Sequence, residues 1–314
     1  MNIVAQGERL QVPVAATIGM FDGVHVGHRS VLAFLRSEAG RRGLSSAAIT
    51  FRRHPQAVLH PDVDFPVLMT PEAKLEALAE TGIDYAIVLD FDKQLSELSA
   101  REFIRLIRDT YGVRLLLVGY DHRFGHNRSD TFADYVGYGR ELGVEVMQTP
   151  ELDTPLGHVS SSVIRRLVAA GDVALAAQML SRPYRLEGTV VGGFKNGRKL
   201  GYPTANIALA DRSLLLPKNG VYAVRVHVDG TLYGGMLNVG VRPTFNGSGK
   251  VSVEVNIFDF DRDIYGSAIA VDFVAHVRDE RRMGSLDELM AQLAADKMQI
   301  QEILKTTLMG CSIN

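Results

Sequence analysis

The first 150 or so residues repeat one pattern, in which a helical segment ends at a glycine and an apolar run follows. These runs lie in "RRGLSSAAITF", "ETGIDYAIVLDF", "TYGVRLLLVGY" and "ELGVEVMQT", preceded by Gly43, Gly82, Gly112 and Gly143. Glycine at such positions is typical of helices that end in the left-handed conformation. Strands that alternate with helices predict a parallel sheet covered on both faces. Ligands of such sheets bind at the carboxyl ends of the strands.

Beyond about residue 183 the pattern changes to the alternation typical of half-buried strands. "VYAVRVHVDGTLYGGMLNVG" alternates on both sides of Asp229 and Gly230, which predicts a hairpin. "KVSVEVNIFDF" alternates again and places Glu254 on its polar face, and "AIAVDFVAHV" predicts another strand. Ser285 and Glu288 form a capping box that begins a final helix. This half therefore predicts a small antiparallel barrel closed by a helix.

The two patterns predict an α/β protein of two domains. We expect residues 1–182 to form a Rossmann-like domain with a parallel sheet, and residues 183–305 to form the barrel domain. Residues 306–314 are expected to be a frayed tail. A length of 314 residues agrees with two domains.

Composition indicates a globular protein without a general affinity for polyanions. The chain is 46% hydrophobic and 22% charged, with a formal net charge of −2. Nucleic acid and acidic membranes are therefore not expected as partners, and an anionic ligand must be met by a local cluster of donors. Cys311 is the single cysteine, so neither an intramolecular disulfide nor a structural cysteine zinc site is expected. No apolar run resembles a membrane span or signal peptide, which favours the cytoplasm.

Candidate chemistry begins with "GMFDGVHVGH", residues 19–28. A strand breaks at Gly19 and a helix is expected to open near Gly27, where free backbone N–H groups and the helix dipole favour phosphate. His25 and His28 are one helical turn apart and both can point at that phosphate. The spacing matches neither a P-loop nor a dinucleotide-binding glycine motif, and no third zinc ligand is nearby.

This segment resembles the HxGH signature of the nucleotidyltransferase superfamily. The resemblance implies that His25 and His28 stabilise the α- and β-phosphates of ATP during adenylyl transfer. It also places Gly19 and Phe21 in the nucleotide site.

A second polar motif, "VSSSVIRRLVAAGD" at 159–172, sets serines before a helix that carries an arginine. Hydroxyls, helix-start amides and a guanidinium together suit a polyphosphate. The motif resembles the late "ISSTxIR" element of the same superfamily, which implies phosphate contacts from Ser161, Ser162 and Arg165.

A third segment, "VGYDHRFGHNR" at 118–128, follows a strand and is polar and aromatic. It resembles the "GxDFRFG" loop of the prokaryotic FAD synthetases. The resemblance implies that Asp121 and Phe124 contact the flavin.

The barrel half carries "GTVVGGFKNGRKLGYPTANI" at 188–207. Thr204 and Asn206 offer hard oxygen ligands that suit Mg²⁺. The run resembles the riboflavin kinase signature "GxxLGxPTAN", and "LPKNGVYAV", "LNVGVRPTF" and "VEVNIFDFDRDIYG" follow in that family's order. Further site residues that this resemblance implies are Gly192 and Gly193 for the nucleotide, Glu254 as general base, and Arg278 at the flavin end.

Together the motifs resemble the family of bifunctional riboflavin kinase/FMN adenylyltransferases. The resemblance implies that ATP phosphorylates riboflavin to FMN and that a second ATP adenylylates FMN to FAD, with Mg²⁺ as the cofactor. The sequence departs from the family at Met20, Val163 and Asn256, where Asn, Arg and His are common. Two alternatives stay open, namely another nucleotidyltransferase whose barrel only binds substrate and a non-catalytic flavin-responsive binding protein.

Overall fold

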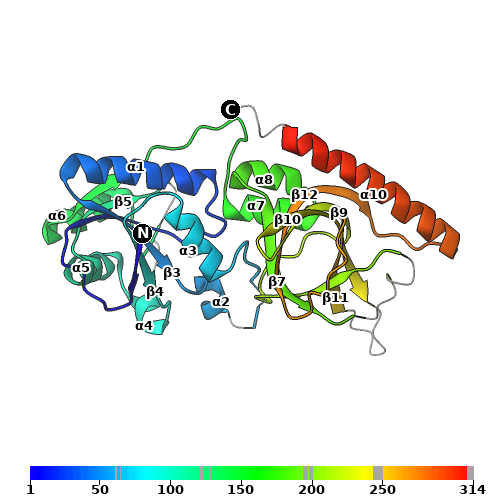
Figure 1. Ribbon diagram of the computed structural model, residues 1–314. Coiled ribbons are helices and arrows are strands. Elements are labelled where there is room, and N and C mark those ends of the chain that lie inside the picture. The colour runs from blue at the N-terminus through cyan, green and yellow to red at the C-terminus, as the bar shows by residue number, and fades with distance from the viewer. Residues whose placement is uncertain are drawn as a thin grey trace. The chain divides into compact units, whose positions relative to one another are not determined.

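A computed structural model describes residues 1–60, 62–63, 65–120, 123–126, 129–193, 197, 201–242 and 250–309. The chain divides into two compact units, Met1–Ser160 and Ser161–Asn314 (Figure 1). Each unit has its own sheet and its own hydrophobic core.

The first unit is built on a parallel sheet of six strands in the order β1-β4-β3-β2-β5-β6. The strands are β1 (Asn2–Ala5), β2 (Val14–Ile18), β3 (Ser45–Phe51), β4 (Tyr85–Leu89), β5 (Val113–Val118) and β6 (Glu145–Gln148). All strand pairs are parallel, which confirms the expected α/β class. The edge strand β1 was not expected, because it is short and mostly exposed and so carries little hydrophobic pattern.

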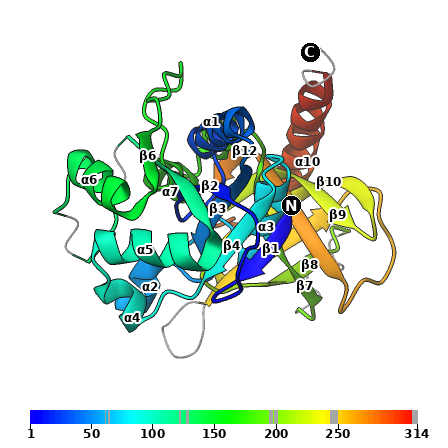
Figure 2. The same ribbon diagram turned by 90° about the vertical axis from the view of Figure 1, so that its left-hand side faces the viewer.

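Helices cover both faces of this sheet (Figures 1 and 2). They are α1 (Val26–Arg42), α2 (Pro55–Leu59), α3 (Pro71–Ala79), α4 (Lys93–Glu97), α5 (Ala100–Tyr111) and α6 (Phe132–Leu142). Alternate residues of β2 enter two different cores: Ala16 packs with α5 and α6, and Ala15 packs with α1 and α3. Because successive side chains of a strand point to opposite faces of the sheet, apolar residues on both faces need a layer of helices on each side.

The expected helix ends are confirmed. Gly43, Gly112 and Gly143 are C-caps with φ of 64°, 66° and 70°. Gly82 is also left-handed, with φ 75°, although α3 already ends three residues earlier, at Ala79. Ser99 and Glu102 form the capping box of α5.

The strand order places a switch point beside the central strand β2. The chain goes from β2 to β3 and β4 on one side, and β5 then returns to the other side of β2. Loops after β2 and β5 therefore leave the sheet in opposite directions and border a crevice at its carboxyl edge. The motif at 19–28 follows β2, so it begins at this crevice.

The second unit contains a closed barrel with the strand order β10-β11-β8-β7-β12-β9. The strands are β7 (Tyr184–Val191), β8 (Ala205–Leu209), β9 (Gly220–Val228), β10 (Thr231–Arg242), β11 (Lys250–Ile257) and β12 (Ala268–Asp279). All pairs are antiparallel. Asp229 and Gly230 have φ of 49° and 74° between β9 and β10, which confirms the hairpin and fits a type I′ turn.

The final helix α10 (Leu286–Met309) packs on the outer face of the barrel. Ile300 and Leu304 contact a core formed with Ala223 and Met236. Residues 306–309 were expected in the tail but are helical, and residues 310–314 lie outside the described part.

Two short helices, α7 (Ser161–Ala170) and α8 (Val173–Leu180), also belong to the second compact unit. α7 packs on α8, and α8 packs on β12 and β7. The buried side chains of α8 are Val173, Ala176, Met179 and Leu180. The barrel unit thus begins at Ser161, earlier than the change in hydrophobic pattern indicates.

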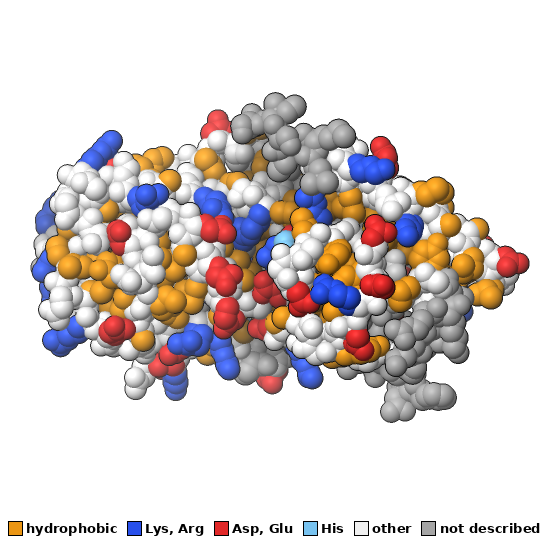
Figure 3. Space-filling view, viewed as in Figure 1, with side chains coloured by type: hydrophobic (Ala, Val, Ile, Leu, Met, Phe, Trp, Pro, Cys, Tyr) orange, Lys and Arg blue, Asp and Glu red, His pale blue; other side chains and the backbone are white. Residues whose placement is uncertain are grey.

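The surface carries charges of both signs. On the face in Figure 3, acidic and basic side chains are interspersed. Within the described residues, no helix has both the length and the hydrophobicity that crossing a bilayer requires.

Candidate active sites

The turn between β2 and α1 has a tightly constrained backbone. Phe21, Gly23 and Val24 have positive φ values of 51°, 83° and 37°. Positive φ is costly for a β-branched residue such as Val24 and marks strain that surrounding contacts must hold. A Cβ on Gly19 would lie 3.2 Å from the Phe21 ring, a tight contact, so glycine gives this ring room to fold back.

The structure brings the two motif histidines together. Their rings stack with centroids 3.6 Å apart, and the Phe21 ring meets His28 edge-on at 5.2 Å. His25 is the N-cap of α1, and its Nδ1 accepts a hydrogen bond from the backbone N of His28 at 3.3 Å. In a neutral ring an accepting Nδ1 places the proton on Nε2. His25 can therefore present an N–H donor at the same helix start as His28.

The serine motif begins α7, as expected. Ser161 is its first residue, and the Arg165 guanidinium donates to the Ser162 hydroxyl at 3.4 Å. Ser162 is exposed and Val163 is half-buried. The hydroxyls, the backbone amides of the first turn and the guanidinium thus lie at one helix end, a combination that suits phosphate oxygens.

The loop after β5 is only partly described. Asp121 lies outside the described residues. Phe124 is buried, stacked on Tyr135 at 4.4 Å and near Phe103 at 5.6 Å. Tyr135 also bonds the backbone N and O of Phe124. The Phe124 ring thus anchors the loop to the helical core.

In the barrel unit, four candidate side chains stand in one row of cross-strand partners. Arg278 pairs with Val221, Val221 with Asn238, Asn238 with Glu254, and Glu254 with Asn206. Direct partners in an antiparallel ladder share a face, and neighbouring strands are about 4.8 Å apart. The row therefore runs about 14 Å from Arg278 to Glu254, across three strand spacings.

This row lies on the outer face that borders α10. Val221 belongs to the cluster formed with the final helix. Arg278 joins β12 to α10, since its guanidinium donates to both carboxylate oxygens of Asp296 at 2.8 to 3.1 Å. Asp296 is fully buried. The arginine is thereby fixed at one end of the row.

At the other end, Thr204 comes close to Glu254. The Thr204 hydroxyl donates to the Glu254 carboxylate at 3.4 Å. Asn256 is buried and donates to the carbonyl of Pro203 at 2.7 Å, which fixes the segment before Thr204. A Cβ on Gly193 would collide with the Asn206 carboxamide, so this glycine permits the close approach of its loop to the row. Gly192 lies next to it, just after β7.

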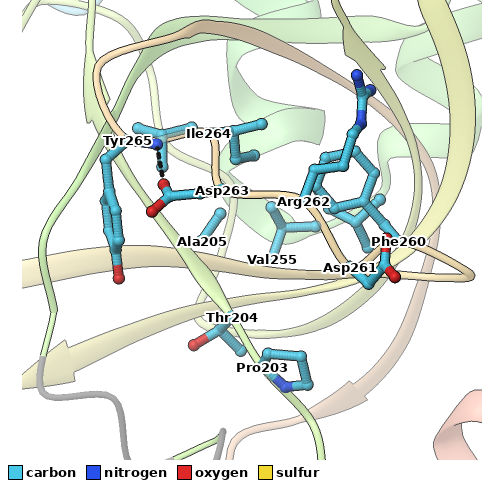
Figure 4. A pocket seen from close by; sticks show the side chains of 12 residues that line it. Pro203, Thr204, Ala205, Val255, Phe260, Asp261, Arg262, Asp263, Ile264 and Tyr265 are labelled. Carbon is cyan, nitrogen blue, oxygen red and sulfur yellow. Dashed lines mark hydrogen bonds between the residues drawn. The ribbon is translucent and has the colours of Figure 1, made fainter.

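A cavity of about 360 Å³ adjoins Thr204 from the opposite face of the strands (Figure 4). Ala205 and Val255, which are cross-strand partners, lie in its wall together with Ile257 and the loop 260–265. Asp263 stabilises that loop by accepting from the backbone N of Tyr265 at 3.0 Å. Thr204 lines the cavity and also contacts Glu254, so it joins the cavity to the polar row.

The donors at this junction suit a magnesium ion. Thr204, Asn206 and Glu254 supply hard oxygens, the ligands that Mg²⁺ prefers when waters and nucleotide phosphates complete its shell. Among the described residues, no group of three or more His, Cys, Asp or Glu side chains is placed to hold a metal by itself.

Sequence reasoning missed Asn238. The residue lies in the alternating run of β10, where the pattern alone does not distinguish a site residue from a solvated one. Its register opposite Glu254 supplies the missing information. Asn238 is half-buried, with its carboxamide close to Gly240.

Comparison with known proteins agrees with the division of the chain into two units. The family described as FAD synthetase matches residues 8–163, and the family described as riboflavin kinase matches residues 180–304. The molecule is therefore of the class that joins a nucleotidyltransferase-type unit to a flavokinase barrel.

Whole-chain relatives narrow the class. Proteins named bifunctional riboflavin kinase/FMN adenylyltransferase are 39% identical in Pseudomonas fluorescens, over 90% of both chains, and 37% identical in Escherichia coli (strain K12), over 93% of both chains. A crystal structure described as a macrolide-efflux protein from Streptococcus pneumoniae has a TM-score of 0.85 at 31% identity, covering 96% of this chain and 99% of that chain. This chain belongs to the family of bifunctional riboflavin kinase/FMN adenylyltransferases.

Proposed function

We propose that this chain phosphorylates riboflavin to FMN with one ATP and adenylylates FMN to FAD with a second ATP, releasing pyrophosphate. The observation that carries the kinase part is the row Arg278–Asn238–Glu254–Asn206 beside the cavity at Thr204. The stacked His25 and His28 at the start of α1 carry the adenylylation part. Because both reactions consume ATP, the expected cytoplasmic location belongs to the same proposal.

In the kinase reaction, the two substrates approach from opposite faces of β8 and β11, ATP from the cavity and riboflavin from the row. The cavity, whose wall at β8 and β11 is apolar, takes the adenine, and the phosphates extend past Thr204 toward the row. Riboflavin lies along the row, with its ring system near Arg278 and its ribityl chain toward Glu254. Glu254 accepts the proton of the terminal hydroxyl as that oxygen attacks the γ-phosphorus, and ADP leaves.

Mg²⁺ belongs to this proposal, with Thr204 and Asn206 as the residues that would hold it. When bound, it neutralises charge on the phosphates. Gly193, which follows Gly192, keeps the neighbouring loop close to Asn206, and Asn256 holds the Pro203 carbonyl.

For adenylylation, no strong base is required, because the FMN phosphate is already a nucleophile. Its oxygen attacks the α-phosphorus of ATP and pyrophosphate leaves. His25 and His28 stabilise the charge that develops on the phosphates, and positioning supplies the rest of the rate. Gly19 and Phe21 shape this turn, and motif resemblance assigns Ser161, Ser162 and Arg165 to the same reaction.

The flavin contacts proposed for adenylylation are Asp121 and the loop that Phe124 anchors. Since the Phe124 ring is packed between Tyr135 and Phe103, it acts in this proposal by shaping the loop.

One incubation tests the proposal. Purified protein with riboflavin, ATP and Mg²⁺ is expected to produce FMN and ADP first, then FAD and pyrophosphate, which chromatography separates. FAD formation from FMN without any riboflavin phosphorylation would favour a nucleotidyltransferase whose barrel only binds substrate. Flavin binding without ATP turnover would favour a non-catalytic binding protein.

A further inference from the structure

A buried lysine lies behind the HxGH turn. Lys74 of α3 is 6% exposed, and its Nζ donates to the carbonyl oxygen of Phe51 at 2.6 Å. Phe51 ends β3, the strand that pairs with β2. The ammonium group therefore lies at the carboxyl edge of the sheet, where the HxGH turn also begins.

A buried carboxylate in that turn acts on this lysine. Asp22 is 5% exposed, and its Oδ1 accepts from the backbone N of Leu68 at 2.9 Å. Burial lowers the pKa of the Lys74 amine to about 8, and attraction by the Asp22 carboxylate opposes the shift. The buried Asp22 carboxylate therefore attracts the buried Lys74 ammonium, at positions where apolar side chains are the rule.

Further contacts connect the same segments. The backbone N of Gly23 donates to the sulfur of Met69 at 3.2 Å, and the Thr50 hydroxyl donates to the carbonyl of Met20 at 3.2 Å. The strained turn 21–24 is therefore held from β3 and from the segment 68–74. His25 follows the turn directly, so the position of its ring depends on these ties.

Packing alone does not require a lysine at position 74. The other buried residues of α3 are Ala77 and Leu78, three and four positions on, so Lys74 occupies the apolar face of the helix. A desolvated ammonium costs free energy that methionine of similar length avoids. The charge is therefore best explained by its hydrogen bond to the Phe51 carbonyl and by the attraction of the nearby Asp22 carboxylate.

We propose that Lys74, acting through Asp22, is a positioning residue for adenylylation, which holds the turn that aims His25 and His28 at the ATP phosphates. The inference rests on the proposed role of these histidines. Lys74 itself contacts no substrate in this proposal.

The expected effect is a loss of rate rather than of affinity. A misplacement of catalytic groups by about 1 Å can cost around 100-fold, so Lys74→Met should lower kcat for FMN adenylylation by about 10- to 100-fold. The KM for ATP should stay within about threefold, since the groups that bind the nucleotide remain present. Lys74→Gln retains a donor for the Phe51 carbonyl without the charge, so its kcat should lie between those of the unaltered protein and Lys74→Met. Riboflavin phosphorylation by the same samples should not change.

The test measures steady-state kinetics of both reactions for full-length variants, with thermal unfolding of each. Asp22→Asn should also lower kcat, and its combination with Lys74→Gln should be no slower than the slower single variant, because the residues act as one unit. Asp84→Asn is the matched control. Asp84 accepts from the backbone N of Ser46 at 2.8 Å near the start of β3, at the opposite edge of the sheet, so kcat should not change.

His28→Ala, measured in parallel, separates the two proposals. If His28→Ala is slow while folded Lys74→Met and Asp22→Asn keep the normal kcat, the positioning role is overturned and the histidine assignment stands. Normal rates in all three variants overturn both. If the lysine variants do not fold, a normal kcat for Asp22→Asn overturns the positioning role and a lowered kcat supports it. If they fold, additive losses of kcat in the double variant refute action through Asp22.

Discussion

At the scale of single residues, several side chains matter through their partners. Asn238 is an example, since neither its type nor its spacing in the sequence marks it as a site residue. It becomes a candidate because the β10–β11 register sets it opposite Glu254, with Arg278 beyond it in the same row. A carboxamide at this place can bond a ribityl hydroxyl or orient the general base.

Asn238→Ala is expected to lower kcat/KM for riboflavin phosphorylation by about 3- to 10-fold, the effect of losing one neutral hydrogen bond. Adenylylation of supplied FMN should not change. Ser252→Ala is the control, because Ser252 lies on the same face of β11 but pairs with Gly240. Both reactions are followed by chromatography. An unchanged kinase rate for Asn238→Ala would remove this residue from the site.

At the scale of elements, α7 and α8 show where sequence patterns stop being informative. The strands, the glycine caps and the hairpin at Asp229 and Gly230 could be predicted because each has a local signal. The packing of α8 on β12 and β7 has no such signal, because the apolar face of a helix does not specify which sheet it packs against. The row that unites Arg278 with Glu254 was equally unavailable, because register across four strands is a property of the closed barrel.

The packing of α8 leads to a prediction about fragments. A fragment 161–314 should unfold at a higher urea concentration than a fragment 183–314, because Val173, Met179 and Leu180 lose buried contacts in the shorter one. Their burial is worth roughly 5 kcal/mol before the entropy of ordering the helices is subtracted, so a difference of at least about 2 kcal/mol is expected. Circular dichroism measures it. Equal midpoints would show that α7 and α8 add nothing to the barrel.

At the scale of the whole molecule, two chemistries are assigned to separate sets of residues. The HxGH turn follows the central strand of a parallel sheet, and the proposed base Glu254 lies on a barrel strand. Both motifs could be predicted from the sequence, because phosphate and metal chemistry demands particular residues at particular spacings. Their supports, such as Lys74 behind the turn and Asp296 behind Arg278, could not, because a buried charge is identified only by its partners.

The most direct test of separate sites compares His28→Ala with Glu254→Gln in the full chain, each supplied with riboflavin or with FMN. His28→Ala should lower FAD formation by roughly 10²- to 10³-fold through loss of a charge-stabilising donor, and should accumulate FMN. Glu254→Gln should lower riboflavin phosphorylation by roughly 10²- to 10⁴-fold through loss of the base, yet still convert supplied FMN to FAD. If each folded variant lost both activities to the same extent, or neither lost any, the assignment of one reaction to each set of residues would be contradicted.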